Sequence, residues 1–257
     1  MRQLNAFIKK EWMEQFRTNK LLIIMIVSVM MGIMAPAVAK LTPVLFEAMA
    51  DTLAEQGIAG IEVGEVTALT SWQQFYKNIS MLVIVFVIMY SGSYTTEYQR
   101  GTLINIVTKG MSRTKILVSK LLVQLVVWTM AYVVNFATTY VYTEYYWDNS
   151  EVKNCIFAGL MVYIFGIWTI GLLTLASSIG DTNMSVLLIT GGVVAVCYIL
   201  SIVPDVAEYM PTKMLGAVEV LDGSVSTANY GKAIAVLAAT YIMSIVGAIL
   251  IFRKKKI

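Results

Sequence analysis

The sequence contains no histidine among its 257 residues, only two cysteines, four prolines and 14% charged residues. Without histidine the chain cannot form a Ser/His/Asp or Cys/His catalytic centre, an HExxH metal site or a His-ligated haem or zinc site. Both cysteines, Cys155 and Cys197, fall within apolar segments, which argues against a disulfide. With so few side chains that can act as general acids or bases, a membrane-embedded enzyme is also disfavoured.

Hydrophobic residues make up 58% of the chain, whereas soluble domains have about 45–50% apolar and 25% charged residues. They gather into runs of about 20, the length of a helix that crosses the hydrocarbon core. We therefore predict an all-α integral membrane protein in which residues 1–257 form a single transmembrane domain. The six predicted spans cover residues 21–39, 78–95, 116–141, 154–177, 184–203 and 233–252.

The basic residues are distributed unevenly along the chain. Residues 1–20, the segment 96–120 and the tail after residue 252 hold fourteen of the nineteen Lys and Arg, and the other three inter-span segments hold twelve of the sixteen Asp and Glu. Cytoplasmic loops of membrane proteins are enriched in Lys and Arg. We therefore expect both termini and the 96–120 segment to lie in the cytoplasm.

The middle of each predicted span lacks Asp, Glu, Lys and Arg, which disfavours ion-coupled transport within this chain. The chain also lacks a GxxxxGK[ST] phosphate-binding loop, since its one Gly-Lys pair, Gly231-Lys232, is followed by Ala233. If the protein moves a solute uphill, the energy must come from a partner.

The 96–120 segment contains apolar residues at helical spacing between Thr102, a candidate N-cap, and Gly110, which would end the helix. These apolar residues are Leu103, Ile104, Ile106 and Val107. A short amphipathic helix at the cytoplasmic ends of two spans can be bound by a soluble protein. The alternative is an inert basic loop that only obeys the positive-inside rule.

The same segment carries a pattern of charged, glycine and hydroxyl residues: Glu97-x-x-x-Gly101-Thr102, then Ser112-Arg113, then Lys120. This pattern, in a six-span chain with a basic N-terminal helix and a long external segment before the last span, resembles the permease subunits of type-2 ATP-binding-cassette exporters. That class includes drug, bacteriocin-immunity and polysaccharide exporters.

The resemblance implies that the segment is a coupling helix seated in a separate cytosolic ATPase, which is present in two copies and binds ATP and Mg²⁺. Glu97 and Arg100 would pair with charges on the ATPase or within the loop, Gly101 would permit the turn, and Arg113 would anchor the third span. The full set of predicted coupling residues is Glu97, Tyr98, Arg100, Gly101, Thr102, Ser112 and Arg113.

The resemblance further implies a multi-pass protein of a bacterial cell membrane that contacts membrane lipids, binds no cofactor of its own and binds no nucleic acid. A path through six helices of one copy would be narrow. We therefore expect a second permease around a central cavity, either an identical copy or a related chain.

The first twenty residues predict an interfacial helix, because apolar residues recur four apart among basic ones. These apolar residues are Leu4, Ile8, Trp12 and Phe16. The resemblance implies an elbow helix that also touches the ATPase. A simple membrane anchor is the alternative.

The first external segment carries an acidic pattern. Glu47, Asp51 and Glu55 form an acidic stripe, which either attracts a cationic peptide or keeps an outward face soluble. After it, Ser71 to Gln74 match a capping box that would open the second span.

The segment 204–232 is too apolar to lie fully in water, so we predict a re-entrant segment. The resemblance implies that it closes the external mouth of the pathway. Its candidate gate residues are Met210, Met214, Leu215 and Val218.

Polar residues within the spans either line a pathway or hold helices together. The candidates are Tyr90, Gln124, Asn135 and Thr138. The leading hypothesis is an exporter subunit that moves an amphipathic or hydrophobic substrate, such as a peptide, an antimicrobial or a lipid-like molecule, by alternating access. The alternative is a membrane sensor or assembly scaffold that transports nothing.

Overall fold

The computed structural model describes residues 2–55, 65–108 and 110–255, and within them the chain is helical and has no strand. Six segments are long and apolar enough to cross a membrane, which confirms the predicted fold class. The spans are formed by α2 (Lys20–Glu55), α3 (Ala68–Tyr90) continued by α4 (Gly92–Gln99), α6 (Arg113–Tyr146), α7 (Cys155–Ile179), α8 (Asn183–Leu200) and α10 (Gly231–Lys254).

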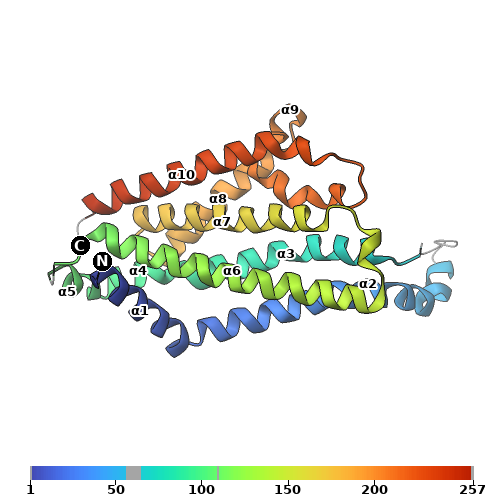
Figure 1. Ribbon diagram of the computed structural model, residues 1–257, viewed down its shortest axis with the longest axis horizontal. Coiled ribbons are helices and arrows are strands. Elements are labelled where there is room, and N and C mark those ends of the chain that lie inside the picture. Colours follow the sequence, from blue (N-terminus) through green and yellow to red (C-terminus); the bar gives the residue numbers. More distant parts are fainter. Residues whose placement is uncertain (1, 56–64, 109, 256–257) are drawn as a thin grey trace.

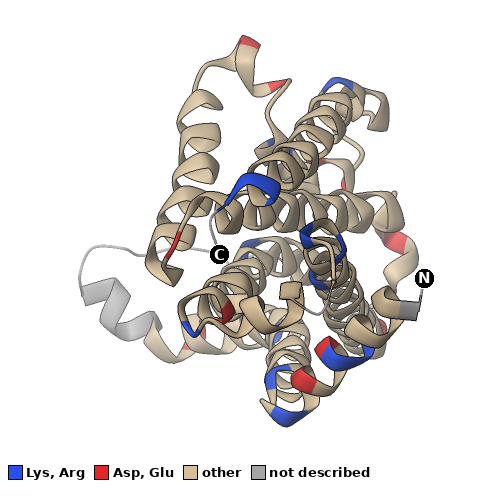
Figure 2. Ribbon diagram, turned by 90° about the vertical axis from the view of Figure 1, so that its left-hand side faces the viewer, with Lys and Arg blue, Asp and Glu red and all other residues tan. Residues whose placement is uncertain are grey.

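The long helices run side by side, and the two ends of the chain lie together at one end of the bundle (Figure 1). We call this the termini end; it also contains α1 (Arg2–Arg17) and α5 (Thr102–Thr108). α6 is central, packing against α1, α2, α3, α7 and α10, while α8 packs mainly on α7. Viewed toward the termini end, the ends of several helices carry Lys and Arg (Figure 2).

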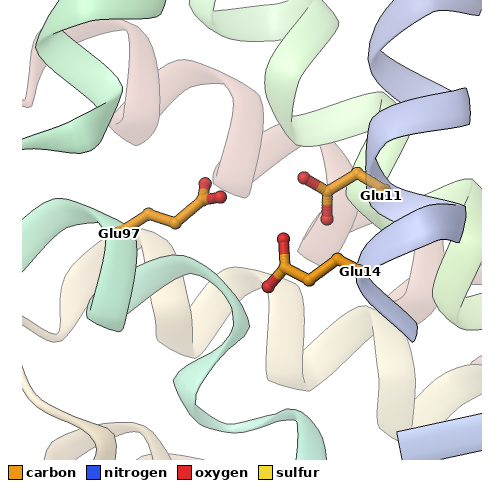
Figure 3. Close-up of side chains that lie close together, drawn as sticks. All are labelled: Glu11, Glu14 and Glu97. Carbon is orange, nitrogen blue, oxygen red and sulfur yellow. The ribbon is translucent and has the colours of Figure 1, made fainter. Parts of the chain in front are cut away.

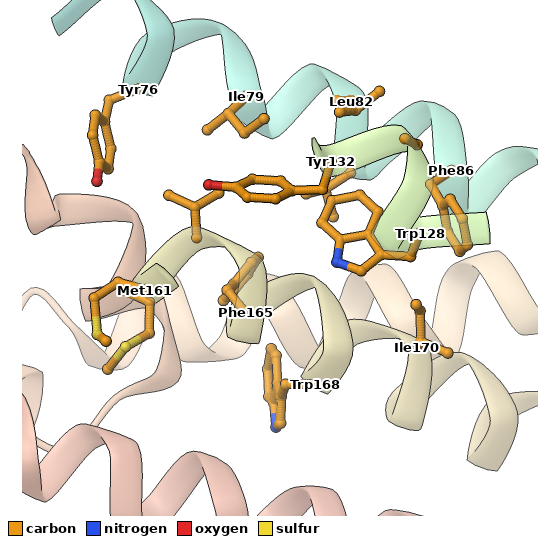
Figure 4. Close-up of a cluster of buried hydrophobic side chains, with 14 of the residues drawn as sticks. Tyr76, Ile79, Leu82, Phe86, Trp128, Tyr132, Met161, Phe165, Trp168 and Ile170 are labelled. Atoms are coloured by element: carbon orange, nitrogen blue, oxygen red, sulfur yellow. The ribbon is translucent and has the colours of Figure 1, made fainter. Parts of the chain in front are cut away.

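The core of the bundle is rich in aromatic side chains from α3, α6 and α7 (Figure 4). The ring of Trp128 on α6 lies edge-on to Phe86 on α3, with centroids 5.4 Å apart, a favoured geometry for aromatic pairs. Gly166 on α7 makes room for Trp128, because a Cβ there would lie 2.0 Å from the indole ring. Trp128 therefore fixes the spacing of α6 and α7.

The second span begins earlier than the sequence predicts. α3 starts at Ala68 and not near residue 78, and the proposed capping box at residues 71–74 is wrong because these residues are already helical. Instead Ser71 shares a hydrogen bond of 2.7 Å with Thr143 on α6, and Trp72 donates to Asn149 over 2.9 Å. Contacts with α6 and the following turn therefore order the polar beginning of this helix.

The segment between α8 and α10 folds back onto the bundle. It contains α9 (Pro204–Ala207), η2 (Pro211–Val220) and η3 (Thr227–Tyr230), and η2 packs against α3, α7 and α10. Among the predicted gate residues Met214 is fully buried, while Met210, Leu215 and Val218 are half-buried. The apolar character of this segment is thus explained by packing, and its role as a gate stays a prediction.

The predicted acidic stripe lies on the part of α2 farthest from the termini. Glu47 is exposed, and the side chains of Asp51 and Glu55 lie outside the described residues.

Candidate functional site

α5 is a short separate helix between α4 and α6 at the termini end (Figure 1). Gly101 and Gly110 flank it with φ angles of 64° and 84°, a backbone region that glycine adopts at little cost. The helix predicted in this segment is therefore confirmed. Thr102 is not its N-cap, because it is the first helical residue and its hydroxyl donates to the Glu97 carbonyl over 3.1 Å.

The two faces of α5 differ in burial. Leu103 is completely buried, whereas Ile104 is 46% exposed, and Asn105 and Thr108 beside it are also exposed. Leu103 belongs to an apolar cluster, separate from the main core, that joins α1, α4, α5, α6 and α10. We call it the terminal cluster; its buried members are Phe7, Tyr94, Leu103, Met111, Ile116, Leu117, Ala248 and Phe252.

Beside the terminal cluster, three helices meet through buried charges. Lys120 on α6 is 1% exposed, and its Nζ lies 3.0 and 2.9 Å from the two carboxylate oxygens of Glu11 on α1. The same Nζ lies 3.1 Å from Glu97 on α4. Lys10 on α1 hydrogen-bonds Glu97 and lies 3.1 Å from Glu14. These five residues, which we call the ion cluster, tie the N-terminal helix to both sides of the α4–α6 connection.

The carboxylates of Glu11, Glu14 and Glu97 point toward one another (Figure 3), and ligand atoms from all three lie within 4.8 Å. Three carboxylates at this spacing would repel strongly without cations between them. The ammonium groups of Lys10 and Lys120 supply that positive charge. The three carboxylates are therefore held together by ammonium groups of the protein itself.

Lys10 is charged at any ordinary pH. Burial alone would lower the pKa of its ammonium group, but hydrogen bonds to Glu97 and Glu11 outweigh burial and hold the pKa above its usual value. The stabilisation from this raised pKa is present below the unfolded-state value of about 10.4 and is lost only as the pH rises beyond it. The positive charge of Lys10 therefore persists through the neutral range.

The other predicted coupling residues also make contacts at the termini end. Ser112 is the N-cap of α6 and accepts from the backbone N–H of Lys115. Arg113 donates to the carbonyl oxygens of Arg253, over 3.2 Å, and Lys255. This contact joins the start of α6 to the last residues of α10. The ring of Tyr98 faces the ammonium group of Lys255 at 4.8 Å, and Arg100 is exposed.

Three of the four predicted pathway residues contact neighbouring helices of the same chain. Tyr90 is fully buried and its hydroxyl donates to Gln15 on α1 over 2.7 Å. Asn135 donates to the Ser28 carbonyl on α2 over 2.9 Å, and Thr138 packs where α2 and α6 approach closely at Gly32. Gln124 is buried, with neither amide atom paired in the described part of the chain. That any of them lines a pathway stays a prediction.

An apolar groove lies along the bundle between α3, α7 and α8, with a volume of about 400 Å³. Its walls include Val87, Phe165 and Val194, and its few polar groups include Thr169 and Thr190. The Thr190 hydroxyl is buried and has no hydrogen-bond partner among the described residues. The groove thus offers an apolar surface with one buried hydroxyl group that has no partner in the described part of the chain.

Several functional candidates were missed by sequence reasoning. Lys10, Glu11 and Glu14 read as polar residues of a surface helix, and their partners Glu97 and Lys120 lie about a hundred residues away. The only signal was that Glu11 sits close to the apolar stripe of the N-terminal helix. A carboxylate beside an apolar stripe is costly to bury without a cation, so it pointed to a partner without naming it.

Together these features define a multi-pass membrane protein with six helical spans and a short helix held at the termini end. A family model described as "ABC-2 family transporter protein" matches residues 6–246, and the chain belongs to this family. It is similar to the uncharacterized transmembrane protein YxlG of Bacillus subtilis, with 22% identity over 219 residues that cover 83% of each chain. Membership makes the chain a membrane subunit of an ABC transporter and implies an ABC-type ATPase partner in general terms.

Proposed function

We propose that this chain is the pathway-forming membrane subunit of an ATP-driven exporter in a bacterial cell membrane, with the termini end in the cytoplasm. A separate cytosolic ATPase, in two copies that bind ATP and Mg²⁺, docks on α5 and the adjoining 96–115 segment. The chemistry of ATP hydrolysis then belongs to the partner. This chain changes conformation and exposes the substrate path alternately to each side.

The observation that supports this proposal most is the two-faced construction of α5. Its outer face presents Ile104 at 46% exposure, while Leu103 on the inner face anchors it in the terminal cluster. Through Glu97 and Lys120 the adjoining helices are joined ionically to α1. A partner that moves α5 therefore moves α1, α4 and α6 with it.

The test is copurification with a candidate ATPase co-expressed with the chain. Ile104→Asp should abolish copurification without lowering the unfolding temperature, because Ile104 projects from the surface. Ile179→Asp is the matched control, since Ile179 is 49% exposed at the end of α7. The docking assignment fails if Ile104→Asp binds the ATPase as the wild type does, or if the control loses it equally.

The substrate we propose is amphipathic or hydrophobic: a peptide, an antimicrobial or a lipid-like molecule. The groove between α3, α7 and α8 supports this class, because its walls are apolar and the Thr190 hydroxyl has no hydrogen-bond partner among the described residues. α8 is the least buried of the six spans, with 11% of its most apolar window buried. A second permease, identical or related, covers the exposed side of α8. The segment η2 closes the pathway at the end of the bundle opposite the termini end.

A sensor or assembly scaffold is the alternative function. The two functions differ in what a substrate does to ATP hydrolysis. For an exporter, hydrophobic peptides or antibiotics added to the lipid-reconstituted complex change the rate of ATP hydrolysis, and Thr190→Val alters this response. If none of these compounds changes the rate of ATP hydrolysis, the result supports the sensor or scaffold function.

A further inference from the structure

A second pocket at the termini end is lined by charged and hydroxyl side chains that the coupling role leaves unexplained. It has a volume of about 530 Å³ and lies between α1, the start of α2, the α3–α4 junction and α5. This volume falls in the range of small-molecule sites, about 300–1,000 Å³. Its charged lining residues are Lys10, Glu14, Lys20, Glu97 and Arg100.

The lining changes from apolar to polar along the direction of the spans. Ile88, which is 56% exposed, and Met89 belong to the last turn of α3. Ser93, Thr96 and Arg100 follow on and after α4, closer to α5. A molecule in this pocket therefore touches exposed apolar surface of a span on one side and hydrogen-bond donors on the other.

The charge left available in this pocket is positive. Both carboxylates in the lining already face lysines: Glu14 lies 3.1 Å from Lys10, and Glu97 contacts Lys10 and Lys120. In residues 2–55, 65–108 and 110–255, neither Lys20 nor Arg100 forms a salt bridge. The Lys20 ammonium lies 5.7 Å from the centre of the Tyr90 ring, so it is held at the pocket without a carboxylate.

We infer that this pocket binds the phosphate group of a glycerophosphate, which an anionic phospholipid presents at this depth. Arg100 offers the planar fork of donors that matches phosphate oxygens, and Lys20 adds a second positive charge. The hydroxyl groups of Ser93 and Thr96 lie in the same lining. The acyl chains of the lipid lie along Ile88, on the membrane side.

The test uses the purified full chain alone, so its outcome does not depend on the proposed ATPase. Lipid retained by the protein in detergent is counted by native mass spectrometry after titration with phosphatidylglycerol or phosphatidylcholine. The wild type should retain phosphatidylglycerol in preference. Lys20→Gln and Arg100→Gln should each weaken this binding about fivefold, the effect expected for losing one hydrogen bond to the phosphate.

Lys9→Gln is the matched control, because Lys9 is exposed on α1 and does not line the pocket. Arg100 is exposed, so Arg100→Gln keeps the test valid if Lys20→Gln unfolds. A parallel titration with soluble glycerol 3-phosphate separates the two sources of phosphate. If glycerol 3-phosphate binds with the same dependence on Lys20 and Arg100 while phosphatidylglycerol does not, the pocket is a phosphate site whose ligand is soluble. Equal phosphatidylglycerol retention in all variants, or an equal loss in Lys9→Gln, overturns the site.

Discussion

At the scale of single residues, Lys120 is the most consequential side chain of the termini end. It is 1% exposed and is shared between Glu11 on α1 and Glu97 on α4. Placing a charge at such a position is costly, and the partners offset that cost only while all are present. The cluster therefore specifies one arrangement of three helices more than it adds net stability.

Lys120→Met should destabilise the chain by roughly 3–5 kcal/mol, because the buried carboxylates of Glu11 and Glu97 then have only the ammonium group of Lys10 between them. Thermal unfolding of the purified protein in detergent measures this loss. The double variant Lys120→Met/Glu11→Leu should recover much of it, since no unpaired charge remains at that point. Lys232→Met is the control, because its partner Glu208 is exposed, and it should leave the unfolding temperature unchanged.

The hydroxyl of Thr190 allows a second test at this scale. It is buried in the groove wall without a hydrogen-bond partner among the described residues, and an unsatisfied buried polar group costs about 1–3 kcal/mol. Thr190→Val keeps the shape and should leave the unfolding temperature equal or higher. A clear drop in that temperature would mean that the hydroxyl is bonded within the folded chain, which would remove it from the proposed substrate surface.

At the scale of helices, Gly166 sets the distance between α6 and α7. A Cβ at this position would meet the Trp128 ring at 2.0 Å, whereas nothing lies within 4 Å of a Cβ at Gly192 on α8. Gly166→Ala should therefore cost roughly 1–3 kcal/mol through overpacking, and Gly192→Ala should be tolerated. Unfolding temperatures of the two variants, measured side by side, decide this. Equal values would contradict the packing described for Trp128.

Hydropathy predicted the six spans because a membrane helix must be apolar along about 30 Å of its length. It missed the first ten residues of α3, since Gln73, Gln74 and Lys77 lower the local hydropathy although neighbouring helices order them. The spacing of apolar residues located α5 but not its orientation: Ile104 shares the stripe of Leu103 yet faces outward. Local periodicity holds no information about which neighbour covers a face.

The ion cluster could not be predicted from the sequence, for a related reason. Its partners are separated by up to 109 positions, and charged residues near predicted membrane ends read as ordinary surface. Only the packing of α1 against α6 brings Glu11 and Lys120 together.

At the scale of the whole molecule, α8 leaves most of its surface uncovered by the described parts of the chain. If a second copy covers it, cysteines on α8 of two copies should form a disulfide on mild oxidation. We expect a dimer for Val196→Cys in a background with Cys155 and Cys197 replaced by Ala, since Val196 is 54% exposed on α8.

Met243→Cys is the control for this experiment, because Met243 is 62% exposed on α10, another poorly covered helix. It should stay monomeric under the same oxidation. Cross-linking through α10 and not α8 would place the second copy on the other side of the molecule.

The terminal cluster joins α1 to α10, since Phe7, Ala248 and Phe252 all belong to it. During synthesis Phe7 emerges before the six spans, and Phe252 emerges only after the other five spans have been made. The inner support of α5 is thus complete only when α10 has been made. A chain that still lacks α10 therefore presents α5 without its full inner support, and the docking on α5 that we propose has to wait until α10 has been made.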